Sequence, residues 1–346
     1  RFKSWFLDIF LAASMLVCLF GITDFFQMNL LHFKDNISPK QYSIFTSTLG
    51  NINTYTAFVS LTIGVSSVLF ASEKKVWKCI WYYVSLMTAL FAIITGQSDN
   101  AYLALLALFG LLPLYMFRSW SGIKRYAVIL ASFFSVIQII DWISQAMSGR
   151  VLKIEGIFSV LVRFSGLAYI VIALWVLVGV LYLSKYILKK QGIEVGKWPR
   201  RAWAILIVVV IAAGIFVLYD ANVAGNGERY GALKSYVVID DEWGTHRGYI
   251  WRLGIENYKE FSPIHKIFGY GPDTFGIITV NNYYEEMASR FFEKFDSAHN
   301  EYLQYFITIG FVGLTAYLCL LFTSIIEMFN ACSKNSFLIA ISFSVI

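Results

Sequence analysis

Long apolar blocks with few charges recur along the chain, each about 17 to 31 residues long, where about 20 suffice for a helix to cross the hydrocarbon layer. Inside lipid, every backbone N–H and C=O must bond within its own segment, so long blocks that do not alternate predict membrane helices rather than barrel strands. Nine such helices are predicted, the last one cut short: 5–26, 55–72, 79–95, 100–117, 126–143, 157–187, 202–219, 301–326 and 336 onward.

The composition agrees with this pattern. The sequence is 58% hydrophobic and 14% charged, whereas soluble domains average about 45–50% apolar and about 25% charged residues. A soluble core cannot absorb that excess, so we expect an all-α polytopic membrane protein. Because the chain starts at Arg1 and stops at Ile346 within an apolar run, we expect it to be a fragment. The four cysteines show no CxxC spacing and predict neither a metal site nor a disulfide.

The net charge of +6 would suggest nucleic acid in a soluble protein, but here it divides between the two sides of a membrane, and we expect no nucleic-acid partner. If the first helix starts inside, twelve basic residues fall in the short cytoplasmic connections, and four fall in the short connections on the other side. This bias satisfies the positive-inside rule. It places the segment 220–300 outside the cytoplasm.

The segment 220–300 is about 80 residues long, polar and rich in glycine, and it far exceeds the usual connection of a few residues. We therefore divide the chain into transmembrane helices at 1–219, an extracytoplasmic loop or lid at 220–300, and two further helices at 301–346. Within the loop, 283–294 is predicted to be helical. Its stripe of Tyr284, Met287, Phe291 and Phe295 favours packing over contact with the membrane surface.

Three motifs in this segment carry residues suited to chemistry. Residues 244–252 (G-T-H-R-G-Y-I-W-R) place Arg247 before an apolar and aromatic stretch. Residues 267–275 (I-F-G-Y-G-P-D-T-F) form a glycine-rich turn, which either exposes N–H groups to an anion or simply reverses the chain. Residues 297–304 (S-A-H-N-E-Y-L-Q) place His299 at the mouth of a predicted membrane helix, as an interfacial polar residue or as a base.

Arg163 is a further candidate because it lies inside an apolar block. The predicted helix 157–187 puts it roughly 9 Å below the outer end. Insertion of an arginine there costs about 2.5–3.5 kcal/mol. The side chain either reaches up to the interface or holds a phosphate by paired hydrogen bonds. We favour the second interpretation.

Together these motifs resemble the O-antigen ligase and polysaccharide polymerase superfamily of bacterial membrane glycosyltransferases. The order R-G-Y-I-W, F-G-Y-G-P-D-T-F, A-H-N-E-Y-L-Q and I-G-F-V-G-L-T-A-Y-L is similar to that of the family, and G-N-I-N at 50–53 resembles an earlier element. The resemblance covers roughly residues 50–325 and is strongest from 244 to 318. One departure is that many relatives have T-x-S-R where this chain has T-G-Q-S-D-N at 95–100, so that arginine is absent.

The resemblance implies a GT-C-like helical bundle, with more helices than this sequence holds. It also implies a polyprenyl-diphosphate-linked glycan donor, and a glycan, lipid or protein acceptor at the outer face. The family needs no metal and no other cofactor. Carried over, it makes His299 and Arg247 catalytic, and Arg163 is compatible with a second essential arginine. We expect Trp251, Tyr270, Asn300 and Tyr302, in the same motifs, to contact substrate.

Elementary chemistry agrees with these roles. Cleavage of an anomeric C–O bond to a diphosphate develops negative charge on the leaving oxygens, and without a metal fixed cations must offset it. Arg163 and Arg247 are suited to this. His299 could accept the proton of the attacking hydroxyl, since histidine titrates near neutrality, or it could bind the diphosphate. A single displacement by the acceptor would invert the anomeric centre.

Other functions stay open at this stage. A ligase and a polymerase that joins lipid-linked repeats share these motifs. A transporter of lipid-linked oligosaccharides would predict repeated halves or discontinuous helices, and the sequence shows no convincing repeat. A membrane scaffold would leave Arg163, Arg247 and His299 without a common purpose.

Overall fold

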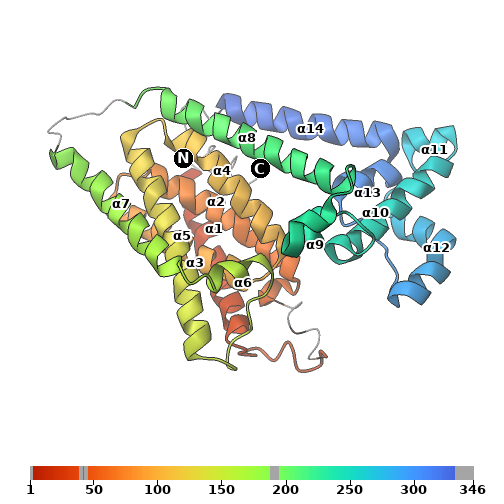
Figure 1. Cartoon of the computed structure of the whole chain (residues 1–346), viewed down its shortest axis with the longest axis horizontal. Coiled ribbons are helices and arrows are strands. Elements are labelled where there is room, and N and C mark those ends of the chain that lie inside the picture. Colours follow the sequence, from red (N-terminus) through yellow and green to blue (C-terminus); the bar gives the residue numbers. More distant parts are fainter. Residues whose placement is uncertain (1–2, 39–41, 43–45, 188–194, 332–346) are drawn as a thin grey trace. The chain divides into compact units, whose positions relative to one another are not determined.

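A computed structural model describes residues 3–38, 42, 46–187 and 195–331 (Figure 1). Within these ranges every regular element is a helix, and seven helices are long and apolar enough to cross a membrane. The predicted all-α polytopic membrane fold is confirmed. The helix predicted from 336 onward lies outside the described residues, and the C-type glycosyltransferase fold stays a prediction.

The chain divides into two compact units, residues 1–207 with 328–346, and residues 208–327. The helices that begin in the first unit are α1 (Lys3–Phe25), η2 (Ser47–Leu49), α2 (Ile52–Ser72), α3 (Val76–Thr95), α4 (Asp99–Met116), α5 (Trp120–Ala146), α6 (Gly156–Val162), α7 (Leu167–Ile187) and α8 (Trp198–Asn222). The later ones are η3 (Gly227–Leu233), α9 (Lys234–Val237), α10 (Trp243–Glu260), α11 (Pro263–Phe268), α12 (Phe275–Phe291), α13 (Glu301–Thr308) and α14 (Gly310–Ala331).

Most predicted spans match one helix, but two do not. The span predicted at 157–187 is broken after Val162, so α6 is a short helix and only Leu167–Ser184 of α7 is a candidate span. The span predicted at 301–326 is likewise broken at Ile309, and the membrane candidate begins at Gly310. In addition, α4 is apolar only over Ala101–Met116 and is too short to count among the seven.

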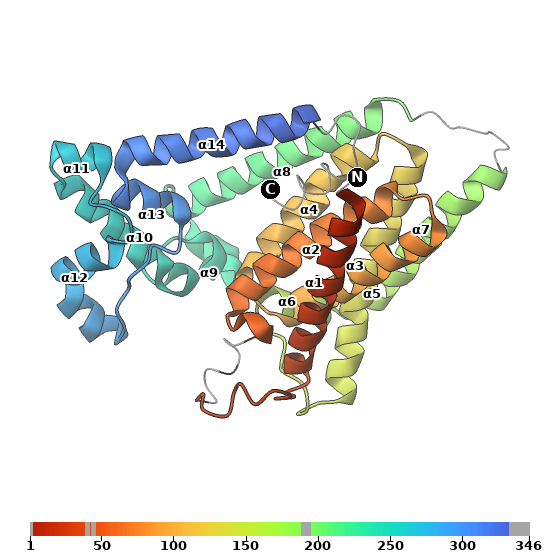
Figure 2. The ribbon, with the colours of Figure 1, turned by 180° about the vertical axis from the view of Figure 1, so that it is seen from behind.

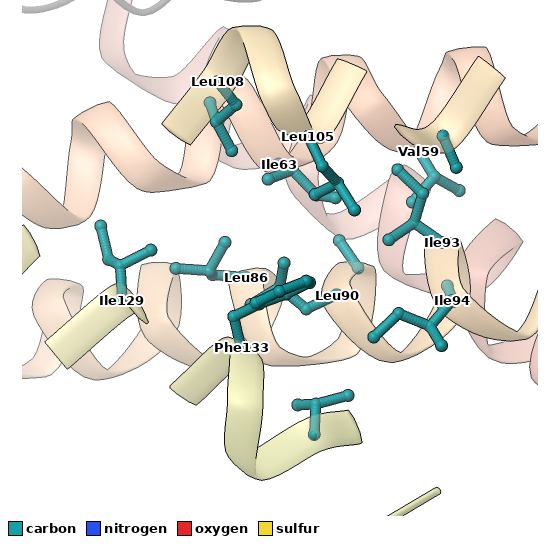
Figure 3. Packing of buried hydrophobic residues seen from close by; sticks show 14 of the residues in the cluster. Val59, Ile63, Leu86, Leu90, Ile93, Ile94, Leu105, Leu108, Ile129 and Phe133 are labelled. Atoms are coloured by element: carbon teal, nitrogen blue, oxygen red, sulfur yellow. The ribbon is translucent and has the colours of Figure 1, made fainter. Parts of the chain in front are cut away.

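The core of the first unit lies between α1, α2, α3, α4 and α5. Leu86, Leu90 and Ile93 on one side of α3 are fully buried against side chains of the neighbouring helices, as Figure 3 shows. They recur at helical spacing, so one stripe of α3 faces the other helices. The apolar period of the sequence therefore determines which face of this helix is inside.

Polar groups in this bundle bond mostly within their own helix. The hydroxyls of Ser60, Ser66 and Ser72 in α2 each donate to the carbonyl four residues earlier. At its start, the Asn51 side chain accepts from the N–H groups of Asn53 and Thr54, so the G-N-I-N element is a helix cap. Such local bonds keep polar groups satisfied in an apolar environment.

The second unit holds the segment that the sequence analysis singled out. Its core gathers Tyr249 and Leu253 of α10, Phe275 and Met287 of α12, and Ile307 of α13. Both Figure 1 and Figure 2 show α10, α12 and α13 side by side. These helices form a small domain with a core of its own.

The helix predicted at 283–294 is longer and starts earlier, at Phe275. Met287 and Phe295 are buried and Phe291 packs against the same cluster, which confirms the packing interpretation for these three. Tyr284 is the exception, because 47% of it is exposed. The backbone departs from helical geometry at Tyr283, so the residues after it do not continue the helical face of the residues before it.

Candidate functional site

Arg247 begins the regular part of α10 after a left-handed turn. Gly244, Thr245 and His246 all have positive φ, between 61° and 68°, which is unusual for the two residues with side chains. A Cβ at Gly244 would lie 3.4 Å from Cδ of Arg247, so the arginine stem lies over this glycine. The turn thereby sets the direction of the Arg247 side chain.

The imidazole of His246 holds the turn from the other side. Its ring centroid lies 4.5 Å from that of Phe291, and its Nδ1 lies 3.2 Å from a Glu242 carboxylate oxygen. These contacts come from α12 and from the residue before α10. The left-handed turn is therefore fixed by neighbours on both sides.

Two nearby arginines are neutralised by carboxylates. Arg252 pairs with Asp241 through two hydrogen bonds of 3.1 Å and with Glu256 at 3.2 Å, and Arg290 pairs with the same Asp241 at 2.6 Å. Glu286 lies within 3.4 Å of Arg252. We call these five residues the arginine clasp. Hydrogen bonds from Arg252 and then from Arg290 hold the pKa of Asp241 below its usual value.

Arg247 differs from both clasp arginines. Among the described residues, its guanidinium has no hydrogen bond and no ion pair, and the residue is half-buried. An arginine cannot lose its charge in a protein, so an unpaired one is available for an anionic ligand. Of the arginines on α10, Arg247 is thus the one free to bind phosphate.

His299 lies on an exposed turn just before α13, with φ of 48°. The expectation that it sits at the mouth of a long membrane helix is wrong, because α13 has only 8 residues and ends before the candidate span. Its neighbours fix its backbone. Gln304 accepts from Ala298 N–H at 2.9 Å, and Asn300 caps α13 by accepting from Tyr302 and Leu303 N–H.

Trp251 connects α10 to this turn. Its indole N–H donates to the carbonyl of Ala298, the residue before His299, at 2.9 Å. Trp251 is also one helical turn after Arg247, and residues four apart lie on one face of a helix. The same face of α10 therefore presents Arg247 and holds the backbone next to His299.

The other predicted contact residues lie nearby in the chain but have different surroundings. Tyr270 stacks on His265 with centroids 3.9 Å apart, and 46% of it is exposed. Tyr302 is 54% exposed on α13. Asn300 uses its carbonyl oxygen as a cap, and Trp251 uses its N–H on Ala298. Contact of these four with substrate stays a prediction.

Two glycines of the glycine-rich turn have their N–H groups engaged by backbone carbonyls. Gly269 N–H donates to His265 O and Gly271 N–H donates to Thr308 O, both at 2.8 Å. Neither N–H is left for a ligand. Of the two interpretations of this motif, the chain reversal is the one that the structure supports.

Arg163 lies in the first unit, at the break between α6 and α7. It is exposed and ends α6, so its predicted position about 9 Å below the end of a continuous helix is wrong. Among the described residues it has no ion pair. Arg163 instead lines a cavity of about 790 Å³ at the C-terminal end of α5, together with Asp141 and Lys153.

Apart from Arg163, the polar residues of this cavity were not singled out in the sequence. Asp141 accepts from Gln138 at 3.1 Å and from Gln145 at 2.8 Å, and all three line the cavity. Their spacing of three and four residues on a predicted helix was the available signal. Two cations and one carboxylate give the cavity an excess of positive charge.

Comparison with known families identifies the segment that contains all three predicted catalytic residues. A family model described as O-antigen ligase matches residues 151–318, just under half of the chain. Comparisons with curated proteins and with solved structures give no match. The match runs from the cavity with Arg163, through Arg247 and His299, into α14. Residues 151–318 of this membrane protein are therefore similar to the O-antigen ligase family.

Proposed function

We propose that this protein is an O-antigen ligase-like glycosyltransferase. It moves a glycan from a polyprenyl-diphosphate-linked donor to an acceptor hydroxyl on the extracytoplasmic face of the cell membrane. The family match supports a ligase or polymerase of surface polysaccharide, and the spans support a multi-pass membrane protein with a lipid-linked substrate. The identity of the donor and the acceptor and the mechanism of transfer are what we propose.

One observation carries it: the unpaired Arg247 lies on the face of α10 that, through Trp251 and Ala298, holds the turn of His299. Transfer from a diphosphate requires a fixed cation and a side chain that can accept a proton. The clasp arginines do not meet this requirement, since Asp241, Glu256 and Glu286 already neutralise them.

In the proposed reaction, His299 accepts the proton of the acceptor hydroxyl while its oxygen attacks C1 of the donor sugar. The bond between C1 and the diphosphate oxygen breaks, and the polyprenyl diphosphate leaves with the electron pair. Arg247 offsets the charge that develops on those oxygens, so no metal is needed for this step. One displacement inverts the anomeric centre.

Arg163 is proposed as the second phosphate-binding cation. Its place in a cavity with Lys153 supports this role, because two cations there favour an anionic group. Lys153 joins Arg163 as a candidate contact.

Polymerase activity is the second candidate, in which the acceptor is another lipid-linked repeat. The family match does not distinguish it from ligase activity. Transfer by purified protein to defined acceptors separates the two, because a polymerase yields a ladder and a ligase yields one transfer to a separate acceptor.

The test measures glycan transfer from a polyprenyl-diphosphate donor by the full chain in liposomes. Arg247→Ala and His299→Ala are each expected to lower the rate about 10²–10³-fold, as loss of a charge-stabilising or acid–base group does. Matched controls are Arg229→Ala, an exposed arginine of the same unit, and His32→Ala on an exposed turn. Full activity of Arg247→Ala or His299→Ala would refute the assignment, and loss of activity with a chelator would refute the metal-free step.

A further inference from the structure

An exposed apolar surface lies within the segment that the sequence analysis treats as polar. It is made of four side chains on α11 and the turn that follows: Ile264, Ile267, Phe268 and Tyr270. Their exposed fractions are 62%, 44%, 60% and 46%. We call these four the interfacial patch. Clustered apolar side chains with this exposure indicate a surface that contacts a membrane or another molecule.

The patch is fixed to the last residue of α13 and the first residue of α14 by direct contact between backbones. Gly271 N–H donates to Thr308 O at 2.8 Å, and a Cβ at Gly269 would lie 2.2 Å from that same oxygen. A Cβ at Gly310 would lie 2.4 Å from Ile267 O. Because no side chain fits between these backbone segments, the depth of the patch relative to the membrane is set by the depth of Gly310.

The length of α14 determines the depth of Gly310 relative to the membrane. α14 (Gly310–Ala331) has 22 residues, which at about 1.5 Å per residue rise about 33 Å, close to the hydrocarbon thickness of about 30 Å. A helix of this length extends only slightly beyond the hydrocarbon. Gly310 therefore lies near the boundary between acyl chains and headgroups, and so does the patch.

The surroundings of the patch fit this boundary. Phe311 and Val312 at the start of α14 are 60% and 47% exposed and continue the apolar surface along the span. On the polar side, Lys266 of α11 donates through Nζ to the carbonyl of Lys259, which brings two lysines together. Apolar side chains flanked by lysines are typical of segments that lie in the headgroup region.

We propose that the interfacial patch inserts into the phospholipid monolayer at the Gly310 end of α14. It acts as an in-plane anchor that holds the domain of α10, α12 and α13 at the membrane surface. The inference rests on the span, the backbone contacts and the exposed side chains, and it holds whether or not the proposed reaction is correct.

The test places a fluorescent label at the membrane boundary. The four native cysteines are replaced, and single cysteines are introduced as Ile264→Cys, Phe268→Cys and, as a control, Ser289→Cys on the exposed polar end of α12. Each is labelled with NBD and reconstituted into phosphatidylglycerol–phosphatidylcholine vesicles. The labels at 264 and 268 are expected to show blue-shifted emission, strong quenching by lipids carrying a nitroxide near the headgroup, and little quenching by iodide.

The label at 289 is expected to show the opposite pattern. If either patch label is quenched by iodide as strongly as the control and no more by lipid nitroxide, the anchor is refuted. Because the replaced side chains are exposed, the variants lose little packing, and a monodisperse elution profile confirms folding before reconstitution. Transfer activity is not part of the readout, so failure here is distinct from failure of the proposed function.

Discussion

Helix α2 of the first unit and the small domain around α10 in the second satisfy their polar groups in different ways. In α2 the serine hydroxyls bond to carbonyls of the same helix. In the second unit, by contrast, Trp251 bonds to Ala298, Arg252 to Asp241, and Gly271 to Thr308, each from one element to another. Local bonds survive a change elsewhere, whereas bonds between elements depend on the whole arrangement. The domain around α10 should therefore be more sensitive to single substitutions than α2.

The largest effect is expected at the contact between two backbones. Gly310→Ala adds a Cβ 2.4 Å from Ile267 O at a φ of 68°, so we expect a loss of about 3 kcal/mol or more in the free energy of unfolding. Gly110→Ala in α4 is the matched control, because no atom lies within 4 Å of its Cβ, and alanine there should stabilise by up to about 1 kcal/mol. Thermal or denaturant unfolding in detergent measures both. Equal stability of the two variants would contradict the comparison.

A smaller loss is expected from the arginine clasp. Arg252→Gln removes pairing to three carboxylates, but the side chain is 38% exposed, so we expect a loss of only about 1–2 kcal/mol that shrinks with added salt. A double-mutant cycle with Asp241→Asn should give a coupling of at least about 0.5 kcal/mol. Ser66→Ala in α2 is the contrast and should change stability by about 0.6 kcal/mol or less. A coupling of zero would mean that the clasp does not stabilise the domain.

The smallest effect on stability is expected from lowering the pH. The pKa of Asp241 is lowered in the folded state, first by its hydrogen bond with Arg252. Its contribution to stability is therefore complete above the unfolded pKa of about 3.9 and is lost as the pH falls through the lower folded value. The unfolding temperatures of the unsubstituted protein and of Arg252→Gln should keep a constant difference above about pH 5 and begin to converge as the pH falls below about 3.9. A difference that already shrinks well above about pH 5 would exclude Asp241 as the titrating group.

The sequence predicted the membrane spans well where the length and apolar character of a segment alone determine that it forms one helix. It missed the break at Arg163 because apolar stretches flank residues 163–166 on both sides and together predict one continuous span. It missed the break before Gly310 for a different reason. The left-handed backbone at Gly310 accompanies close contact with Ile267, which is distant in the chain, and local patterns do not report such contacts.

The candidate site was predicted in part. Resemblance singled out Arg247 rather than Arg252, although the two lie in one motif. What distinguishes them physically is the position of Asp241 and Glu286, which come from other elements. In the same way, the cavity around Asp141 and Lys153 depends on how α5, α6 and the start of α7 pack together. Sequence patterns identify residues that could do chemistry, whereas their neutralisation or exposure depends on tertiary contacts.

The left-handed turn at Gly244, Thr245 and His246 has a consequence for genetics. Backbone in this region costs roughly 1–2 kcal/mol for each residue other than glycine, so the turn persists only while its neighbours hold it. Phe291, which packs on His246, is one such neighbour and belongs to another helix. A screen for inactive alleles should therefore recover substitutions at Phe291 and Glu242 as well as at Arg247. Loss-of-function alleles would then identify the residues that stabilise the turn, including residues that do not contact the sugar.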